Sequence, residues 1–465
     1  MTSLVSDNYL YEPTPRVLDG YSFRTLLSSE SSSYQLGDYV RIAIPPVSNG
    51  FLNTANSWVN ITIGDVVLNG TALVQDTPTK AGVRHSIAGV HSLIDTCSIV
   101  SPNGQFLEHT PNYQAQQVMN WINNTDLAAA LPNSITNNTP DVDNTFEDFT
   151  TVNGNSIELD INLTGTVATG VETEHFSPTL SCMLNGTKAL PICWFASDTH
   201  LELLLTKDIL SVFHNASYNP TGPVVGLLGS GSCTITVEID AMIDVVTDNS
   251  MTMIKKKAGY GSGRPVSWSG TQQRSSIHSI STAELNTTGE NIKSTIIGGV
   301  RPRKLLSIQQ SAFVNHPSGH YDRWQCVNPY SNGSWQMRIG TQLYPPRPME
   351  SAAEMVQHVQ KCYNQKSLTV TNNRLKEGYY GPRFNEQGTG TIDTFRGTCG
   401  YDFTTFDGNS DGLDTTNIII ETLGGLKSPA TSPAEMAQFP YQIVTMKRFQ
   451  VLYSVDDAGN VCVSY

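Results

Sequence analysis

The chain has 465 residues, a length that fits two large or three smaller domains. Charged residues make up only 15% of it, which excludes a coiled coil and a charge-rich disordered chain and suits strands joined by polar turns. The net charge of −13 is unevenly spread. Residues 1–254 carry 7 basic against 25 acidic side chains, and residues 255–465 carry 21 against 16. This difference predicts two domains with different neighbours.

Neither terminus carries a Lys/Arg-rich arm of the kind that packages nucleic acid. The chain also lacks an apolar run of about 18 residues and a basic start followed by an apolar core, so we expect neither a membrane span nor export. Because the cysteines are dispersed and form no C-x-x-C pair, we expect all eight to be reduced thiols. They are Cys97, Cys182, Cys193, Cys233, Cys326, Cys362, Cys399 and Cys462.

Apolar and polar residues alternate in many segments, as they do in half-buried strands. In chain order these segments are residues 59–63, 201–205, 237–245, 335–343 and 449–455. Turn signals separate the segments, for example Asn69-Gly70, Asn103-Gly104 and Asn332-Gly333. The pattern predicts an all-β protein built as sandwiches or barrels.

Two segments have helical spacing instead. In each, four apolar residues lie at positions i, i+3, i+4 and i+7: Ala115, Val118, Met119 and Ile122 in one, and Ala352, Met355, Val356 and Val359 in the other. Both follow a proline, and Ser351 with Glu354 resembles a capping box. Because the two helices are about half the chain apart, we interpret the protein as one β-rich unit with an inserted helix, used twice.

The boundary between the two units is predicted at residues 255–265, where three lysines and a glycine-rich stretch interrupt the strand pattern. The charge balance changes sign at the same place. The predicted organisation is therefore an N-terminal arm at 1–20, a first unit at 21–254, a linker at 255–265 and a second unit at 266–465.

Motifs for catalysis are weak. The glycine-rich stretches at 229–232 and 259–263 lack both the Lys-Ser/Thr of a phosphate loop and the serine register of a nucleophile elbow. A loop with possible metal ligands contains His316, His320, Asp322 and Cys326, but no paired ligand motif accompanies it. The basic clusters at 255–257 and 301–304 lack the interleaved aromatic residues of a single-strand binding surface. We therefore expect no catalytic residue, no cofactor and no enzyme activity.

The strongest metal signal is the segment 407–412. Asp407, Asn409 and Asp411 alternate before Gly412, as the first ligands of a calcium loop do. The twelfth position is Ile418 rather than a bidentate glutamate, and Asp, Asn and Gly also form ordinary turns. The prediction is no metal site, with calcium binding by these three residues left open.

The order of these elements resembles that of the double jelly-roll major capsid proteins of icosahedral double-stranded DNA viruses. This lineage includes adenovirus hexons, tectiviruses, virophages and polinton-like viruses. The resemblance lies in the opening strands at 39–46 and 58–63, in the Asn103-Gly104 turn before the first helix, and in Tyr344–Pro348 leading into the second helix. It covers nearly the whole chain as a similarity of order and pattern, and no single motif in it is diagnostic.

The resemblance implies two consecutive eight-stranded jelly rolls side by side, each with a short inserted helix. It further implies a homotrimeric, pseudo-hexagonal capsomer that contacts neighbouring capsomers and penton and minor capsid proteins. Such a shell encloses double-stranded DNA without reading its sequence, in a virion assembled inside the host cell. Whether a membrane lies beneath the shell stays open.

Two other classes of protein fit the composition. A capsid protein with one jelly roll and a projecting domain is also rich in strands, although it predicts a basic arm. A β-sandwich that binds or cleaves glycans is the second, since 41 acidic residues could include a catalytic pair.

Overall fold

The structure is a computed structural model. The described residues are 22–69, 80–85, 89–124, 156–161, 167–169, 174–178, 180, 190–207, 212–215, 232–247, 265–278, 284–285, 291–300, 335–350, 352–363, 382–384, 392–395, 398–405, 413–414, 420–423 and 442–464.

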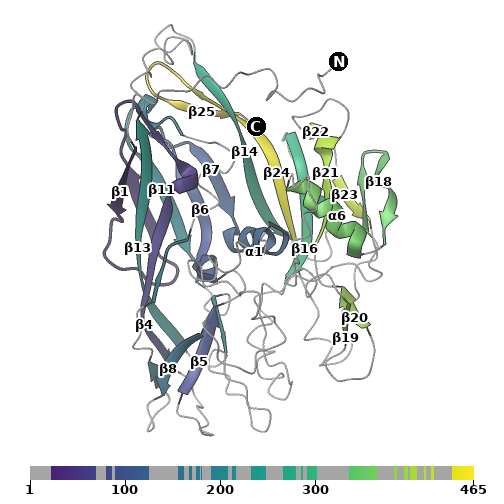
Figure 1. Ribbon diagram of the computed structural model, residues 1–465, viewed down its shortest axis with the longest axis horizontal. Helices are drawn as coiled ribbons and strands as arrows, with labels where there is room; N and C mark the ends of the chain where they lie inside the picture. Colours follow the sequence, from purple (N-terminus) through teal and green to yellow (C-terminus); the bar gives the residue numbers. More distant parts are fainter. Residues whose placement is uncertain are drawn as a thin grey trace.

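The N-terminal half forms a larger and a smaller antiparallel sheet, which we call roll 1 (Figure 1). The larger sheet has the order β1-β13-β4-β9-β8-β5-β12, with β10 paired to β4 and β3 to β13. Its strands are β1 (Ser22–Ser28), β3 (Gly50–Leu52), β4 (Trp58–Asn69), β5 (Lys80–His85), β8 (Ser156–Ile161), β9 (Val167–Thr169), β10 (Glu174–Phe176), β12 (Phe213–Asn215) and β13 (Ser232–Thr247). The smaller sheet has the order β2-β11-β6-β7, from β2 (Tyr39–Ile44), β11 (Thr199–Leu205), β6 (Ile94–Val100) and β7 (Phe106–Pro111).

The C-terminal half, which we call roll 2, repeats this plan. Its larger sheet has the order β14-β24-β16-β21, with β22 paired to β16 and β25 to β24. Its strands are β14 (Val266–His278), β16 (Asn291–Val300), β21 (Cys399–Asp402), β22 (Leu413–Asp414), β24 (Gln442–Val455) and β25 (Val461–Ser464). The smaller sheet has the order β15-β23-β17-β18, from β15 (Glu284–Leu285), β23 (Ile420–Leu423), β17 (Trp335–Ile339) and β18 (Gln342–Met349). Strands β19 (Pro382–Phe384) and β20 (Ile392–Phe395) pair separately.

The two rolls share one eight-stranded topology. In roll 1 it is β1-β13-β4-β10 packed with β2-β11-β6-β7, and in roll 2 it is β14-β24-β16-β21 packed with β15-β23-β17-β18. Each set of four strands appears in the same chain order and the same sheet order. Strands β5, β8, β9 and β12 extend roll 1 beyond this common core.

The two predicted helices occupy the same place in this topology. Helix α1 (Tyr113–Asn124) directly follows β7, and α6 (Ala352–Cys362) directly follows β18, the last strand of each smaller sheet. The repeated helical spacing in the sequence therefore reflects a repeated position. The packing differs, since α1 contacts β6 and roll 2 whereas α6 lies mainly against β21 of its own roll.

Alternation of apolar residues predicts the buried face of most strands correctly. Strand β11 alternates buried and partly exposed positions throughout, and β4 buries Val59, Ile61 and Ile63. The prediction of one strand through residues 335–343 is wrong. Gly340, with φ of 59°, turns the chain, so β17 and β18 form a hairpin and Leu343 is 43% exposed.

Within the described residues, four short 3₁₀ segments connect the strands: η2 (Thr54–Asn56), η3 (Gly89–Leu93), η4 (Ile192–Trp194) and η5 (Phe403–Thr405). Among the described residues, neither helix has the length and apolar composition that a membrane crossing requires.

Candidate functional site: the inter-roll interface

The sequence-predicted ligands and basic clusters lie outside the described residues. These are His316, His320, Asp322 and Cys326, the calcium candidates Asp407, Asn409 and Asp411, and the basic residues at 255–257 and 301–304. Across the described parts of the chain, His, Cys, Asp and Glu form no group of three that could hold a metal. The best-defined constellation of polar side chains in these parts is instead the interface between the two rolls.

Strand β14 of roll 2 supplies buried donors to the backbone of roll 1. The side-chain amide of Gln272 donates to the carbonyl of Leu107 in β7 and to the hydroxyl of Tyr453, the latter at 2.8 Å. The Ser275 hydroxyl lies 2.8 Å from the carbonyl of Pro111 and 2.9 Å from that of Asn112, where α1 begins. Both Gln272 and Ser275 are fully buried, so these bonds form away from water, where an unmade bond is costly.

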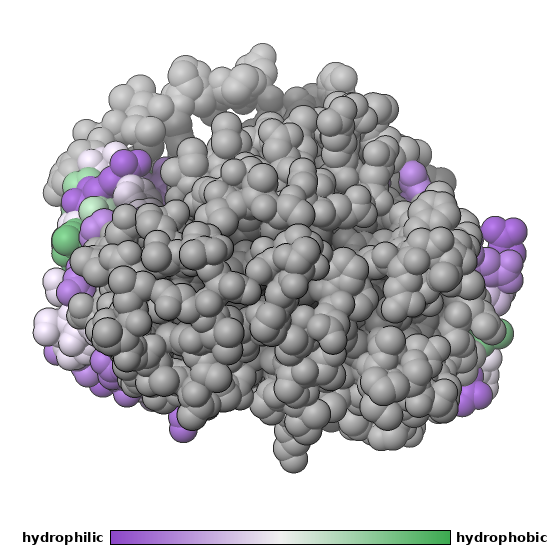
Figure 2. All heavy atoms as spheres, turned by 90° about the horizontal axis from the view of Figure 1, so that it is seen from below, coloured by the Kyte–Doolittle hydropathy of each residue, from purple (hydrophilic) through white to green (hydrophobic). Residues whose placement is uncertain are grey.

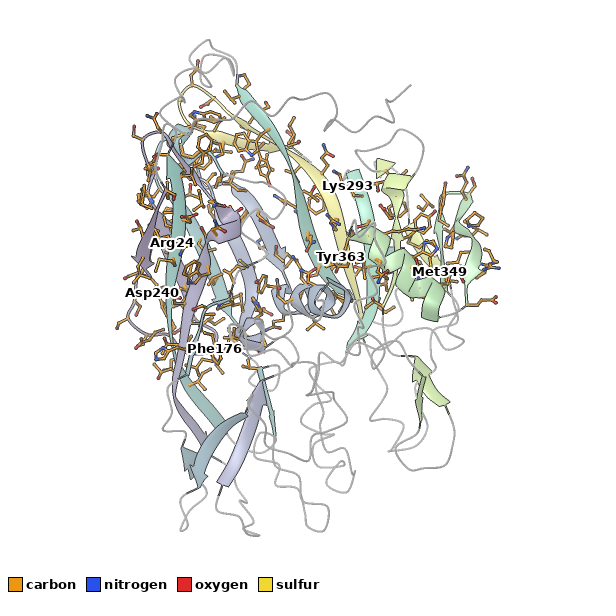
Figure 3. The ribbon with its side chains drawn as sticks, viewed as in Figure 1. Arg24, Phe176, Asp240, Lys293, Met349 and Tyr363 are labelled. Carbon is orange, nitrogen blue, oxygen red and sulfur yellow. The ribbon has the colours of Figure 1, made fainter. Side chains whose placement is uncertain are left out.

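Helix α1 is bonded to roll 2 from two sides. The amides of Gln116 and Asn120 donate to the side-chain oxygen of Gln273, at 3.1 Å and 3.3 Å. The hydroxyl of Tyr363, just after α6, lies 3.3 Å from the carbonyl of Met119 and 3.1 Å from the Asn120 side-chain oxygen. Figure 3 shows Tyr363 between the two helices. These contacts hold the helix of one roll against the sheet of the other.

A continuous apolar core crosses the interface. Among the described residues, the largest buried cluster contains residues from the strands of roll 1 together with six from roll 2, namely Val266, Phe449, Val451, Tyr453, Val455 and Val461. The Trp268 ring stacks on Tyr453 with centroids 5.5 Å apart, and Trp194 of roll 1 lies 6.4 Å from Trp268. Since burial of apolar surface stabilises by about 25 cal/mol per Å², these aromatic side chains favour a fixed arrangement of the two rolls.

The β24–β25 hairpin docks on the chain that follows η4. The amide of Ala196 donates to the carbonyl of Gly459 at 3.3 Å, and the side chain of Asn103 donates to the carbonyl of Val461 at 3.0 Å. The Asp456 carboxylate accepts bonds from the backbone amides of Ala458 and Asn460 and from the Asn460 side chain, which lower the pKa of Asp456. The carboxylate therefore holds the shape of the turn that approaches roll 1.

Burial favours the neutral forms of two histidines and two cysteines near this interface. It lowers the pKa of His91, whose ring nitrogen lies 3.2 Å from the Tyr113 hydroxyl, to about 4. It also lowers the pKa of His109, with a further contribution from the Arg274 charge, and it raises the pKa of the Cys362 and Cys399 thiols. Neutral, desolvated groups of this kind suit a structural interface.

Comparison with solved structures identifies the architecture. No protein-family profile matches the sequence, and no curated protein matches it. The 3.5 Å cryo-EM structure of the Sputnik virophage superposes with a TM-score of 0.60 and 11% identity, over 98% of this chain and 90% of that chain. PBCV-1 VP54, in a crystal structure fitted into a cryo-EM reconstruction of the same virophage, gives a TM-score of 0.52 and 11% identity over 98% and 99%.

The chain has the double jelly-roll fold. The predicted all-β class with two consecutive rolls is confirmed. The alternative with one jelly roll and a projecting domain is wrong, because the second half repeats the topology of the first. The domain limits stay a prediction, since β13 ends at Thr247 and β14 begins at Val266, and the residues from 248 to 264 lie outside the described set.

The thiol prediction needs one correction. Cys193, Cys362, Cys399 and Cys462 are not disulfide-bonded, but Cys97 of β6 is. Cys97 is fully buried in the core of roll 1. In a double jelly roll, sheets made of distant chain segments bring cysteines together regardless of their spacing along the sequence, and so the absence of a C-x-x-C pair was misleading.

Sequence reasoning missed the polar residues that join the rolls of this double jelly-roll protein. Residues 271–276 of β14 are polar at every position, whereas a half-buried strand alternates. The polarity of both faces of β14 was the signal that could have predicted this interface. A buried strand of this kind must find hydrogen-bond partners on both sides.

The buried carboxylate of Asp244 was also missed. It accepts a bond from Asn53 at 2.9 Å, and the Asp244 backbone amide donates to Ser57 at 3.1 Å. The Asp244 side chain also lies 4.0 Å from Arg24 on β1. These contacts join the segment around η2 and strand β1 to β13, so the role of Asp244 is structural.

Proposed function

We propose that this chain is the major capsid protein of an icosahedral double-stranded DNA virus, with a structural and non-enzymatic role. The observation that carries the proposal is the pair of topologically equivalent rolls joined by a buried interface. A rigid pair of this kind presents two similar prisms side by side, which is the shape needed to tile a flat facet. The two similar structures come from a virophage and from a protein fitted into a virophage reconstruction, which supports the same role.

The assembly unit that we propose is a homotrimer. In a closed ring in which each roll meets the next through a similar contact, three chains supply six rolls. The resulting outline is close to hexagonal, so capsomers contact one another along flat sides and contact penton and minor capsid proteins at vertices and seams. The chain then resides in the virion, is made and assembled in the host cell, and encloses DNA without base-specific contacts.

The domain limits are part of the proposal: an arm at 1–20, roll 1 at 21–254, a linker at 255–265 and roll 2 at 266–465. Strands β1 and β14 begin next to the limits at 21 and 266, and β13 ends at Thr247, before the limit at 254. Limited proteolysis that cuts first within residues 248–265 would support the linker, whereas early cleavage inside β13 or β14 would contradict it.

Particle imaging tests the function. We expect purified full-length protein to sediment as a trimer, and cryo-EM of assembling preparations to show capsomers of hexagonal outline and curved or closed shells. Monomers at micromolar concentration under conditions that support assembly, with no lattice in the images, would contradict the proposal.

A further inference from the structure

The outer face of the β1–β13–β4 sheet in roll 1 carries a partly exposed apolar strip. Met242 of β13 lies between Leu26 of β1 and Trp58 of β4 in the strand register, and Leu26 is 50% exposed. The Arg24 guanidinium lies 5.2 Å from the centre of the Trp58 ring. Residues of the opposite parity, such as Ala241 and Val59, are buried in the roll's own core. We call this strip the β1 face.

The equivalent face of roll 2 is covered within the chain. There, Met446 of β24 lies between Ser275 of β14 and Ile296 of β16, and Met446 and Ile296 are fully buried. Helix α1 of roll 1 lies against this sheet, since Ser275 bonds its first turn and the terminal methyl of Met119 lies 2.6 Å from the position that a Cβ at Gly298 would take. The apolar middle of the roll 2 sheet is thus hidden by the helix that follows the edge strand of roll 1.

Roll 2 has the counterpart of that covering element. Strand β18 and helix α6 correspond to β7 and α1, which bond to roll 2 inside the chain. On β18, Leu343 is 43% exposed, Pro346 is exposed and the Arg347 side chain is 81% exposed. We call this surface the β18 edge.

The two surfaces lie on opposite sides of the chain and differ in charge. Figure 3 places Arg24 and Asp240 at the outer margin of roll 1, and Met349, the last residue of β18, on the far side of roll 2. Figure 2 shows hydrophobic atoms at both of these margins, among largely hydrophilic neighbours. On the β1 face Arg24 lies 4.0 Å from Asp244, and Glu238 and Asp240 flank the strip. On the other surface Arg347 is paired with Glu354 at 3.1 Å, and Arg338 of β17 is exposed. Beyond these two ion pairs, the acidic Glu238 and Asp240 and the basic Arg338 supply complementary charge.

We propose that the β18 edge of one copy docks on the β1 face of a second copy, repeating between chains the contact that β7 makes with roll 2 inside a chain. The contact is heterologous, so each copy uses both surfaces and the set closes into a ring. This inference rests on the trimer in the proposed function and names the residues at its seam. Apolar anchors at the centre are Leu26 and Leu343, and the charged residues at the rim orient the two copies.

A cross-linking experiment on the full-length protein tests the pairing directly. The double variant with Leu26→Cys and Leu343→Cys, treated with a short bismaleimide, should give covalent dimers and trimers on a denaturing gel. Either single variant should give no more cross-linking than the wild-type chain, whose exposed Cys462 sets the background. Cross-linking by a single variant would mean that like surfaces meet, and would overturn the heterologous pairing.

Substitutions at the two apolar anchors provide a second test of the proposed contact. Leu26→Glu and Leu343→Glu, both at exposed positions, should each raise the trimer dissociation constant by about tenfold or more, since each places an unpaired charge in an apolar contact. Leu452→Glu is the matched control at 48% exposure on β24, and it should leave the trimer unchanged. A wild-type trimer that forms no cross-link in the double variant would overturn this seam alone. A wild-type chain that stays monomeric would overturn the trimer of the proposed function and the seam with it.

Discussion

The docking of the two rolls requires a residue without a Cβ at position 459, which is Gly459. Its φ is +82°, and a Cβ at this position would lie 2.6 Å from the backbone nitrogen of Ala196 and 2.9 Å from the carbonyl oxygen of Trp194. Both atoms belong to backbone of roll 1, which cannot move aside as the end of a flexible side chain can. We therefore predict that Gly459→Ala loosens the β24–β25 hairpin from roll 1.

The magnitude has two parts. An alanine with positive φ costs roughly 1–2 kcal/mol, and forcing a methyl group into closely packed surroundings costs typically about 1–3 kcal/mol more. The total expected for Gly459→Ala is thus about 2–5 kcal/mol. Gly340→Ala is the matched control, because its φ is +59° but no atom lies within 4 Å of the added Cβ. It should cost only the first part.

Hydrogen exchange followed by mass spectrometry is the appropriate assay, since two packed rolls need not unfold in one step. Gly459→Ala should speed exchange in the peptide that contains the Ala196 amide, which donates to Gly459 across the interface. Gly340→Ala should leave that peptide unchanged. Equal destabilisation by the two variants, or unaltered exchange at Ala196, would refute the argument that this glycine is required for docking.

Three further predictions follow from burial and charge. The pKa of His91 is about 4 in the folded protein against an ordinary 6.5, so the unfolded chain binds the proton more readily. The contribution of His91 to the free energy of unfolding is therefore complete above about pH 6.5. The free energy of unfolding should fall by about 3 kcal/mol as the pH drops to about 4. Urea unfolding should show this slope, and His91→Asn should flatten it. Mass mapping without reductant should recover Cys97 in a disulfide, whereas Cys362 and Cys399 should alkylate only after unfolding; a free Cys97 thiol would contradict the structure. Because the acidic and basic halves alternate around the proposed ring, trimer assembly should slow between about 0.15 M and 1 M salt while formed trimers persist, and rates independent of salt would assign the charge difference to outward surfaces.

Local patterns in the sequence were sufficient for the elements and for the repeat. Alternating residues in β4, β11 and β24 predict their buried faces, because the period of a strand is two and one face of each sheet is buried. The spacing of apolar residues at 115–122 and 352–359 predicts α1 and α6, and their separation predicts a unit used twice. The chain turns at Gly340, but the alternation of apolar and polar residues continues across this turn. The sequence pattern therefore did not predict the hairpin of β17 and β18.

Only the tertiary structure decided how the two rolls are joined. The polar run of β14 could have indicated a solvated strand, and it is buried because Gln272 and Ser275 find carbonyl groups of β7 and α1. The close approach of Gly459 to Ala196 depends in the same way on residues that lie far apart in the chain. A local pattern records which face of an element avoids water, but it does not record which other element covers that face, because this depends on the packing of the whole chain.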